Sequence, residues 1–464
     1  MTERLFCAPR PGADLLIRGA QVLDPRGELD EPRDILIRDG HISEIAPPES
    51  IAADDRIDVV QAAGKHLFPG FVDPHVHLRT PGQEHKEDLD TGTAAAAAGG
   101  YCAVVAMPNT SPTVDTAAVL GSLIEMARRQ ARVPVGFLAS ITRGLEGDEL
   151  TEMAELRDLG AIGFTDDGKP VVSAGMLRKA LQYQRLCGGV IALHEEDPAL
   201  SQDGVMHEGA VSARLGMAGI PSLSESTMIA RDGSLALYED ARVHFQHLSA
   251  VESVQALAAA KQAGARVSGE ASPHHLTLTD DVVRTLDSRF KMNPPLRAES
   301  DRRALVEGLR SGIIDCIATD HAPHAVHEKE VPFEQAPMGV TGLETAFAAV
   351  YTELVISGEL ELATVIERMS AGAGLYGLPA PRIAVSEPAN VCLIDLETRY
   401  EVGEDGYVSR SANCAFHGRT LYGRVLLTLA AGAIAYRRPM LVTGNSESRP
   451  AETAAASAHP EGER

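Results

Sequence analysis

Short apolar runs recur through the middle of the chain and alternate with longer stretches of helical composition such as TAAVLGSLIEMARRQ and DRRALVEGLRSG. Runs of strand type that alternate with helices predict parallel strands joined by right-handed crossovers. Eight such units over residues 69–378 predict a closed (β/α)8 barrel, with an open doubly wound sheet as the alternative. The eight runs are GFVDPHVH, CAVVAMPN, VPVGFLAS, AIGFTDD, GVIALHEE, RVHFQHLS, ARVSGEASPHH and DCIATDH.

The two ends of the chain share a different pattern. Residues 14–68 contain LLIRGAQVLD, RDILIRDGHISEIAP and IDVVQAAGKHLFPG, and residues 379–440 contain ANVCLIDL, GRTLYGRVLLTL and AIAYRR. Alternation punctuated by Asp-Gly and Pro-Gly pairs is typical of hairpins. We therefore predict that 14–68 and 379–440 form one composite β-sandwich domain beside the barrel. Residues 441–464 are polar and rich in alanine, which predicts a disordered tail.

Polar residues that can titrate or bind metal stand at the end of most of the eight runs. In a (β/α)8 barrel the catalytic residues lie at the carboxyl ends of the strands, so this even placement favours the barrel over the open sheet. The residues in question are His75 and His77, Asp166 and Asp167, His194, His247 and Asp320.

Composition narrows the class of protein. The chain has 65 Asp and Glu residues against 42 Lys and Arg, a formal net charge of −23, which disfavours nucleic-acid binding because phosphate would be repelled. No signal peptide is evident at the N-terminus, and the late apolar stretch 425–436 is too short to span a bilayer and divides into two strands at Ala431-Gly432. We expect a cytoplasmic protein with reduced, buried thiols, because none of the cysteines forms a C-x-x-C pair: Cys7, Cys102, Cys187, Cys316, Cys392 and Cys414.

His75 and His77 are the first candidate metal ligands. Side chains repeat every second residue along a strand, so both imidazoles face the same side and can share one ion. A lone His-x-His pair fits a structural role equally well. Here the pair follows FPGFVD and precedes Leu78-Arg79, which favours metal binding.

The sequence around these residues resembles the dihydroorotase family of the amidohydrolase superfamily, in particular the bacterial type I, aspartate-bridged members. The resemblance covers the whole predicted barrel in order, and its implied fold is the same barrel with a two-part β-sandwich. It rests on GFVDPHVHLRTPGQEHKED, AMPNTSPTVD, GFTDDGKPV, ALHEED, HLS, ASPHHL, MNPPLR, ATDHAPH and PMGVTGLET.

The resemblance implies two zinc ions per subunit, and imidazole and carboxylate ligands suit that metal. Many relatives bridge their metals with a carboxylated lysine on strand four, where this chain has Thr165-Asp166-Asp167 and Lys169 comes too late to reach. We favour Asp167 over Asp166 as the bridging ligand. The implied ligand set is His75, His77, Asp167, His194, His247 and Asp320.

Such a metal pair would produce hydroxide at neutral pH, because zinc lowers the pKa of bound water toward roughly 7. A metal-bound hydroxide attacks an amide carbonyl, and Asp320 takes its proton and delivers it to the leaving nitrogen as general acid/base. The alternative for Asp320 is a helix cap. The implied reaction is the reversible interconversion of (S)-dihydroorotate and N-carbamoyl-L-aspartate in pyrimidine (UMP) biosynthesis.

Substrate binding follows from charge, since dihydroorotate carries a carboxylate beside its ring. Arg79 lies two residues beyond His77 on the same alternation, and a guanidinium suits a carboxylate. The resemblance assigns that carboxylate to Arg79, Asn109 and His324, although Asn109 and Asn293 could each be turn residues. It adds His77 at the metal rim and Asn293, Met338 and Gly339 for the ring. Met338 stands where the family usually has an aromatic residue, which Met can replace flexibly.

Other features receive a plainer interpretation. His274-His275 is expected to pack behind the ligands, while His85, His207 and His327 are expected in solvated loops. The alanine run 94–98 is expected to be a helix packed closely on the barrel.

Two alternatives remain open. One is another cyclic-amide hydrolase: a hydantoinase, allantoinase or dihydropyrimidinase. The other is a non-catalytic scaffold for aspartate carbamoyltransferase, which would lack several ligand residues. Partners expected for the active enzyme are its small-molecule substrate, further copies in a homo-oligomer and, as a candidate, aspartate carbamoyltransferase, but neither nucleic acid nor membrane.

Overall fold

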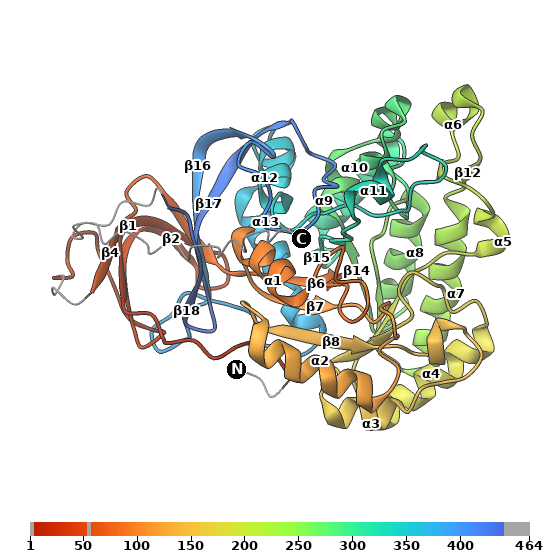
Figure 1. Cartoon of the computed structure of the whole chain (residues 1–464), viewed down its shortest axis with the longest axis horizontal. Coiled ribbons are helices and arrows are strands. Elements are labelled where there is room, and N and C mark those ends of the chain that lie inside the picture. The colour runs from red at the N-terminus through yellow and green to blue at the C-terminus, as the bar shows by residue number, and fades with distance from the viewer. Residues whose placement is uncertain (1–3, 53–56, 440–464) are drawn as a thin grey trace, which may run out of the picture.

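The computed structural model describes residues 4–52 and 57–439, so the predicted tail at 441–464 lies outside the described residues. Figure 1 shows two parts side by side. A curled sheet from the two ends of the chain lies on one side, and a larger body of strands and helices lies on the other.

The larger part is the predicted barrel. All eight apolar runs are strands, and they are parallel neighbours in the order β15-β14-β13-β10-β9-β8-β7-β6. Continuous burial explains why the runs are apolar on both faces; every residue of β6 and β7 is buried. The strands are β6 (Phe71–Val76), β7 (Tyr101–Ala106), β8 (Val135–Ala139), β9 (Gly163–Thr165), β10 (Ile191–Leu193), β13 (Val243–Phe245), β14 (Val267–Ala271) and β15 (Cys316–Ile317).

Contacts between the first and last strands close the barrel. Val76 bridges His321 in parallel, and His77 N–H donates to the His321 carbonyl at 2.9 Å. Below this bridge the buried Asp73 carboxylate accepts from the Thr319 hydroxyl at 2.5 Å and from its N–H at 3.1 Å. Closure therefore brings the residues after β6 next to those after β15.

Helices surround the barrel, and their sequences show why they form. In α2 the Thr116 side chain caps the first turn, and buried Leu120, Leu123, Ile124 and Ala127 repeat at helical spacing. The predicted alanine helix is α1, which packs on β7 and on the small sheet. The helices are α1 (Leu89–Ala98), α2 (Ala117–Gln130), α3 (Met153–Leu159), α4 (Ala174–Cys187), α5 (Pro198–Ser201), α6 (Ala210–Leu215), α7 (Leu223–Glu239), α8 (Val251–Gln262), α9 (Pro273–Thr277), α10 (Glu299–Ser311), α11 (Val326–Lys329), α12 (Ala346–Val350), α13 (Leu362–Ser370) and α14 (Gly372–Leu375).

Short elements complete this part of the chain. The strands β11 (Met206–His207) and β12 (Gly219–Ile220) pair in a separate two-stranded sheet. Three 3-10 turns cover Arg143–Leu145, Asp280–Thr285 and Ser288–Phe290, and a π-helical turn covers Tyr351–Val355.

The small domain is a β-sandwich built from both ends of the chain. Its eight-stranded sheet has the order β18-β17-β16-β5-β1-β2-β3, with β4 paired to β1. The sheet curls over a shared core that includes Leu15, Ile35, Leu67, Leu393 and Leu427. As predicted, the late apolar stretch divides at Ala431-Gly432. The strands are β1 (Leu15–Asp24), β2 (Leu29–Arg38), β3 (His41–Ala46), β4 (Asp58–Gln61), β5 (His66–Pro69), β16 (Val391–Glu401), β17 (Thr420–Ala430) and β18 (Ala433–Arg437).

One loop of this domain packs on the barrel. Between β16 and β17, buried Val402, Cys414 and Phe416 join a hydrophobic cluster with Met292 and Val340 of the barrel. The loop thus crosses to the barrel, although the predicted domain 379–440 counted it with the sandwich.

The cysteines divide into two groups. Cys102, Cys316, Cys392 and Cys414 are buried thiols, whereas Cys7 and Cys187 are partly exposed, so the expectation of burial was wrong for those two. Among the described residues, no helix has both the length and the apolar character needed to cross a lipid bilayer.

We expect the buried core of the sandwich to contribute to the free energy of unfolding. Leu393→Ala removes a fully buried side chain and should lower the free energy of unfolding by about 2–5 kcal/mol. The matched control is Leu237→Ala, because Leu237 is 43% exposed on α7. Thermal unfolding of both variants checks this, and equal midpoints would contradict it.

Candidate functional site

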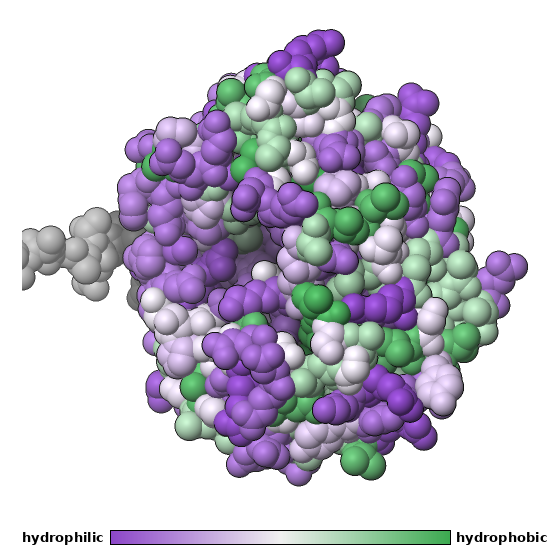
Figure 2. Space-filling view, turned by 90° about the vertical axis from the view of Figure 1, so that its right-hand side faces the viewer, coloured by the Kyte–Doolittle hydropathy of each residue, from purple (hydrophilic) through white to green (hydrophobic). Residues whose placement is uncertain are grey.

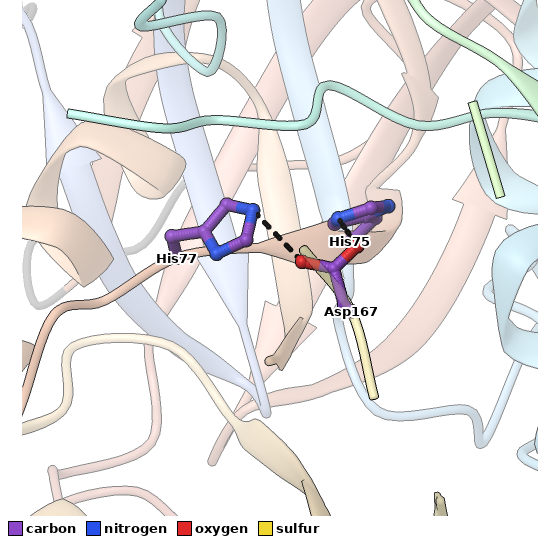
Figure 3. A group of neighbouring side chains, drawn as sticks. All are labelled: His75, His77 and Asp167. Atoms are coloured by element: carbon purple, nitrogen blue, oxygen red, sulfur yellow. Dashed lines mark ion pairs between the residues drawn. The ribbon is translucent and has the colours of Figure 1, made fainter. Parts of the chain in front are cut away.

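Six side chains predicted as ligands converge at the carboxyl ends of the barrel strands. His75 and His77 come from the end of β6, and Asp167 follows β9. Figure 3 shows the Asp167 carboxylate between the two imidazoles, with Oδ1 at 3.4 Å from His75 Nε2 and Oδ2 at 3.5 Å from His77 Nε2. This group can hold one metal ion.

A second group shares the same carboxylate. His194 follows β10 and His247 follows β13, and their atoms Nδ1 and Nε2 lie 2.8 Å apart. Asp167 Oδ1 is 4.0 Å from His194 Nδ1 and 3.7 Å from His247 Nε2. Asp167 therefore faces four imidazoles and belongs to both candidate metal groups.

Asp320 contacts the same pair of imidazoles, those of His75 and His77. It follows β15, and its Oδ1 is 3.1 Å from His77 Nε2 and 3.5 Å from His75 Nε2. Its placement inside the cluster argues against a simple helix cap.

The residues present fit a pair of divalent cations. His75 Nε2 is buried and has no hydrogen-bond partner among the described residues, yet it points at the two carboxylates. An imidazole lone pair in that position is unsatisfied without a cation. Buried nitrogen and carboxylate ligands of this kind are typical of zinc and other transition metals.

The structure separates the two neighbouring aspartates. Asp166 turns away from the histidines and accepts hydrogen bonds from Ile141 N at 2.8 Å, Thr142 N at 3.0 Å and the Thr142 hydroxyl at 2.5 Å. It therefore fixes the turn after β8. Lys169 is exposed.

A buried carboxylate that sequence reasoning missed supports the ligands from behind. Glu270, near the end of β14, lies 2.7 Å from His75 Nδ1 and 3.0 Å from His244 Nε2. It also accepts the backbone N–H of His247 at 3.1 Å. A carboxylate at Nδ1 leaves the Nε2 lone pair of His75 free for a metal. The sequence feature that could have indicated Glu270 is a single acidic residue within the strand run ARVSGEASPHH.

A cation lies at the rim of the cluster. Arg79 is 8% exposed and donates from Nε to the Pro323 carbonyl at 3.2 Å. Burial lowers the pKa of Arg79 to about 10, so it stays charged at neutral pH. Burial, helped by the Arg79 charge, lowers the pKa of His324 to about 3, so that imidazole is neutral. Its Nε2–H donates to the Met338 carbonyl at 2.9 Å.

Two asparagines contact the predicted ligands or a side chain next to them. Asn109 donates from Nδ2 to Asp167 Oδ2 at 3.1 Å, and its Oδ1 is 2.9 Å from His77 Nδ1. Asn293 donates to Glu196 Oε2 at 2.7 Å, and Glu196 in turn is 3.2 Å from His194 Nε2. Sequence reasoning missed Glu196, whose only signal was its place two residues after His194.

The remaining histidines mostly follow expectation. His274 and His275 are buried, and His85 and His327 are exposed. The expectation for His207 was wrong. It is 9% exposed because it packs on buried Arg297, whose Nη1 lies 3.3 Å from His207 Nδ1.

The mouth of the barrel faces one side of the molecule. The arrow of β8 in Figure 1 points toward the right-hand side, and Figure 2 shows that this side is hollowed and that hydrophilic surface borders much of the hollow. A polar entrance suits a small charged molecule better than an apolar one.

Comparison with known proteins gives a consistent picture. The family model described as "Dihydro-orotase-like" matches residues 64–254. A protein named dihydroorotase from Desulforapulum autotrophicum is 42% identical over 91% of this chain and 100% of its own length. Another of that name from Anaeromyxobacter dehalogenans is 44% identical over 91% of this chain and 98% of its own.

Solved structures share the fold. The L-hydantoinase (dihydropyrimidinase) of Arthrobacter aurescens superposes with a TM-score of 0.82 at 25% identity, covering 93% of this chain and 97% of the other. The dihydropyrimidinase of Brevibacillus agri gives a TM-score of 0.79 at 23% identity, covering 92% and 96%.

The two aspartates give a matched test of the metal ligands. Asp167→Asn should lower divalent-metal affinity by more than the roughly 10–100-fold that loss of a supporting partner costs. Asp166→Asn should keep the metal and lose about 1–3 kcal/mol of stability, because it weakens buried hydrogen bonds. Metal content per chain after dialysis decides between them. Equal metal loss in both variants would contradict the assignment.

Proposed function

The chain belongs to the dihydroorotase family of cyclic amidohydrolases, and on that basis we propose that it interconverts (S)-dihydroorotate and N-carbamoyl-L-aspartate in pyrimidine biosynthesis. One observation carries the proposal. Four imidazoles and two carboxylates converge on one centre, and the buried Arg79 cation lies at its rim. A hydrolytic centre next to a carboxylate-binding cation fits a cyclic amide that bears a carboxylate.

The ligand set supports two zinc ions per chain. His75 and His77 would hold one, His194 and His247 the other, and Asp167 would bridge them, with Asp320 completing the first site. When bound, such a pair supplies a hydroxide nucleophile at neutral pH and polarises the amide carbonyl.

Asp320 is proposed to move the proton. Water adds to the ring carbonyl carbon, and the bond from that carbon to the ring nitrogen breaks. The products are a ureido NH₂ group and a carboxylic acid, which releases its proton to solvent and becomes a carboxylate. Asp320 takes the proton from the attacking water and delivers it to the leaving nitrogen. Its Oδ1 lies 3.1 Å from His77 Nε2, and this contact would hold the carboxylate near both the attacking water and the leaving nitrogen. Ring closure follows the same path in reverse.

The rim residues are proposed to bind the substrate. Arg79, Asn109 and neutral His324 would contact its carboxylate, while Asn293 and the backbone at Met338-Gly339 would contact the ring. Asn109 and Asn293 already touch the ligands or their partners, so each can link the substrate to the centre.

A hydantoinase or dihydropyrimidinase is the alternative within the same class, and the solved neighbours carry those names. The family resemblance implies a carboxylated lysine as the metal bridge of hydantoinases and dihydropyrimidinases, whereas the Asp167 carboxylate lies among the imidazoles here. A buried arginine at the rim also has no partner in dihydrouracil, which lacks the carboxylate. Both points favour dihydroorotate.

The scaffold alternative requires the loss of ligands. All six are present and converge, which favours an active enzyme. A cytoplasmic location, homo-oligomer formation and association with aspartate carbamoyltransferase stay predictions, and co-purification with the transferase tests the last.

Arg79 should decide between carboxylate-bearing and neutral rings. Arg79→Met removes a charge-assisted contact and should lower kcat/KM for dihydroorotate by about 10–100-fold, with little change for dihydrouracil. Arg129→Met on the exposed end of α2 is the control. Wild-type preference for dihydrouracil over dihydroorotate would overturn the proposed function.

Asp320→Asn should remove the proton transfer and lower kcat by about 10²–10⁴-fold. Metal content must be measured on the same sample, because Asp320 is also a proposed ligand. A variant that keeps its metal and a wild-type kcat would refute the role.

A further inference from the structure

A buried lysine lies just outside the proposed substrate site. Lys329 ends α11, the short helix that follows His324, and its side chain is 7% exposed. The ammonium donates to three main-chain carbonyls, those of Pro337 at 2.8 Å, Gly339 at 2.9 Å and Lys291 at 3.3 Å. Its partners are therefore the backbone of the turn 337–339 and a neighbouring loop.

An asparagine from the small domain reaches the same turn from the other side. Asn413 lies in the loop between β16 and β17 and is 5% exposed. Its Nδ2 donates to the Gly339 carbonyl at 3.1 Å and to the Ala322 carbonyl at 3.2 Å. Its Oδ1 accepts the His324 N–H at 3.1 Å. The Gly339 carbonyl thus receives hydrogen bonds from both Lys329 and Asn413.

The turn between these residues is closely confined. Gly339 has φ +128°, and a Cβ there would lie 2.8 Å from Ala322 Cβ and 3.1 Å from His324 Nε2. The Gly339 N–H donates to the Lys291 carbonyl at 3.0 Å, and His324 binds the Met338 carbonyl. A shift of this backbone would therefore move His324 as well.

Burying the Lys329 ammonium costs free energy. Burial, with the nearby Lys291 ammonium, lowers the pKa of Lys329 to about 7. Only the protonated amine has the three N–H groups that three carbonyl acceptors require. Its partners are carbonyl dipoles rather than a carboxylate, so burial of the charge is only partly offset. A side chain retained purely for stability would more readily be apolar.

We propose that Lys329 and Asn413 are positioning residues that hold the Gly339 carbonyl between them and so place Met338, Gly339 and His324 against the substrate. The inference rests on the proposed function, which assigns those three residues to substrate binding. It also gives the small domain a role at the site, because Asn413 belongs to its loop.

Two variants test the pair independently. Lys329→Met keeps an unbranched side chain of nearly the same length and removes the ammonium, and Asn413→Ala removes the second contact. Each should raise KM for dihydroorotate about 10-fold or more, because the binding surface is displaced. At saturating substrate kcat should fall less than about 3-fold, and zinc content should stay at the wild-type level, since neither residue touches a ligand.

Lys261→Met is the matched control. Lys261 on α8 also binds carbonyls, those of Ile313 at 2.7 Å and Gly312 at 3.4 Å, together with Asp315. It lies at the opposite end of β15 from the site, so its loss should lower thermal stability and leave KM unchanged.

The outcomes separate the two claims. Failure of the wild type to turn over dihydroorotate would refute the proposed function itself. An active wild type whose folded Lys329→Met or Asn413→Ala variant keeps a wild-type KM, or loses kcat and zinc instead, would overturn this inference alone. If Lys329→Met does not fold, Asn413→Ala decides by the same criterion.

Discussion

The structure depends on one arrangement, the Asp167 carboxylate held among four imidazoles at the carboxyl end of the barrel. Lone pairs and negative charge face one another there in a buried space. Such a cluster is unfavourable on its own, and cations relieve it. Its members come from four different strands, so only a closed barrel can bring them together. The contact between β6 and β15 is therefore as important for the chemistry as for the fold.

Successive layers of hydrogen bonds hold this cluster in place. Glu270 orients His75 and binds the backbone of His247, so one carboxylate serves ligands from two strands. Asp73 and Thr319 join the first and last strands directly beneath the ligands. Asp166 fixes the turn after β8 next to Asp167. Three of these four side chains carry a carboxyl group, and burying a charged carboxylate lowers the stability of the protein. Their hydrogen bonds hold the site rigid in return.

Charge is distributed unevenly over the protein. The chain has a formal charge of −23, yet the rim of the site holds Arg79, whose pKa of about 10 keeps it charged at neutral pH. This guanidinium is buried, so solvent and salt screen its charge weakly. An anionic substrate can therefore find a local attraction inside an acidic protein. The small domain takes part through Asn413, because the loop between β16 and β17 packs on the barrel.

The eight strand runs, the division of the small domain between the two chain ends and the six side chains that converge at the barrel mouth could all be predicted before folding. This was possible because apolar periodicity and the position of His and Asp at strand ends are local properties. Folding was needed to show that Asp167 faces the imidazoles while Asp166 accepts hydrogen bonds from the Ile141-Thr142 backbone. The tertiary structure alone revealed Glu270, Glu196, Lys329 and Asn413, and it placed His207 inside the protein. Their partners are distant in sequence or are main-chain atoms, and neither kind of contact leaves a pattern that the chain displays before it folds.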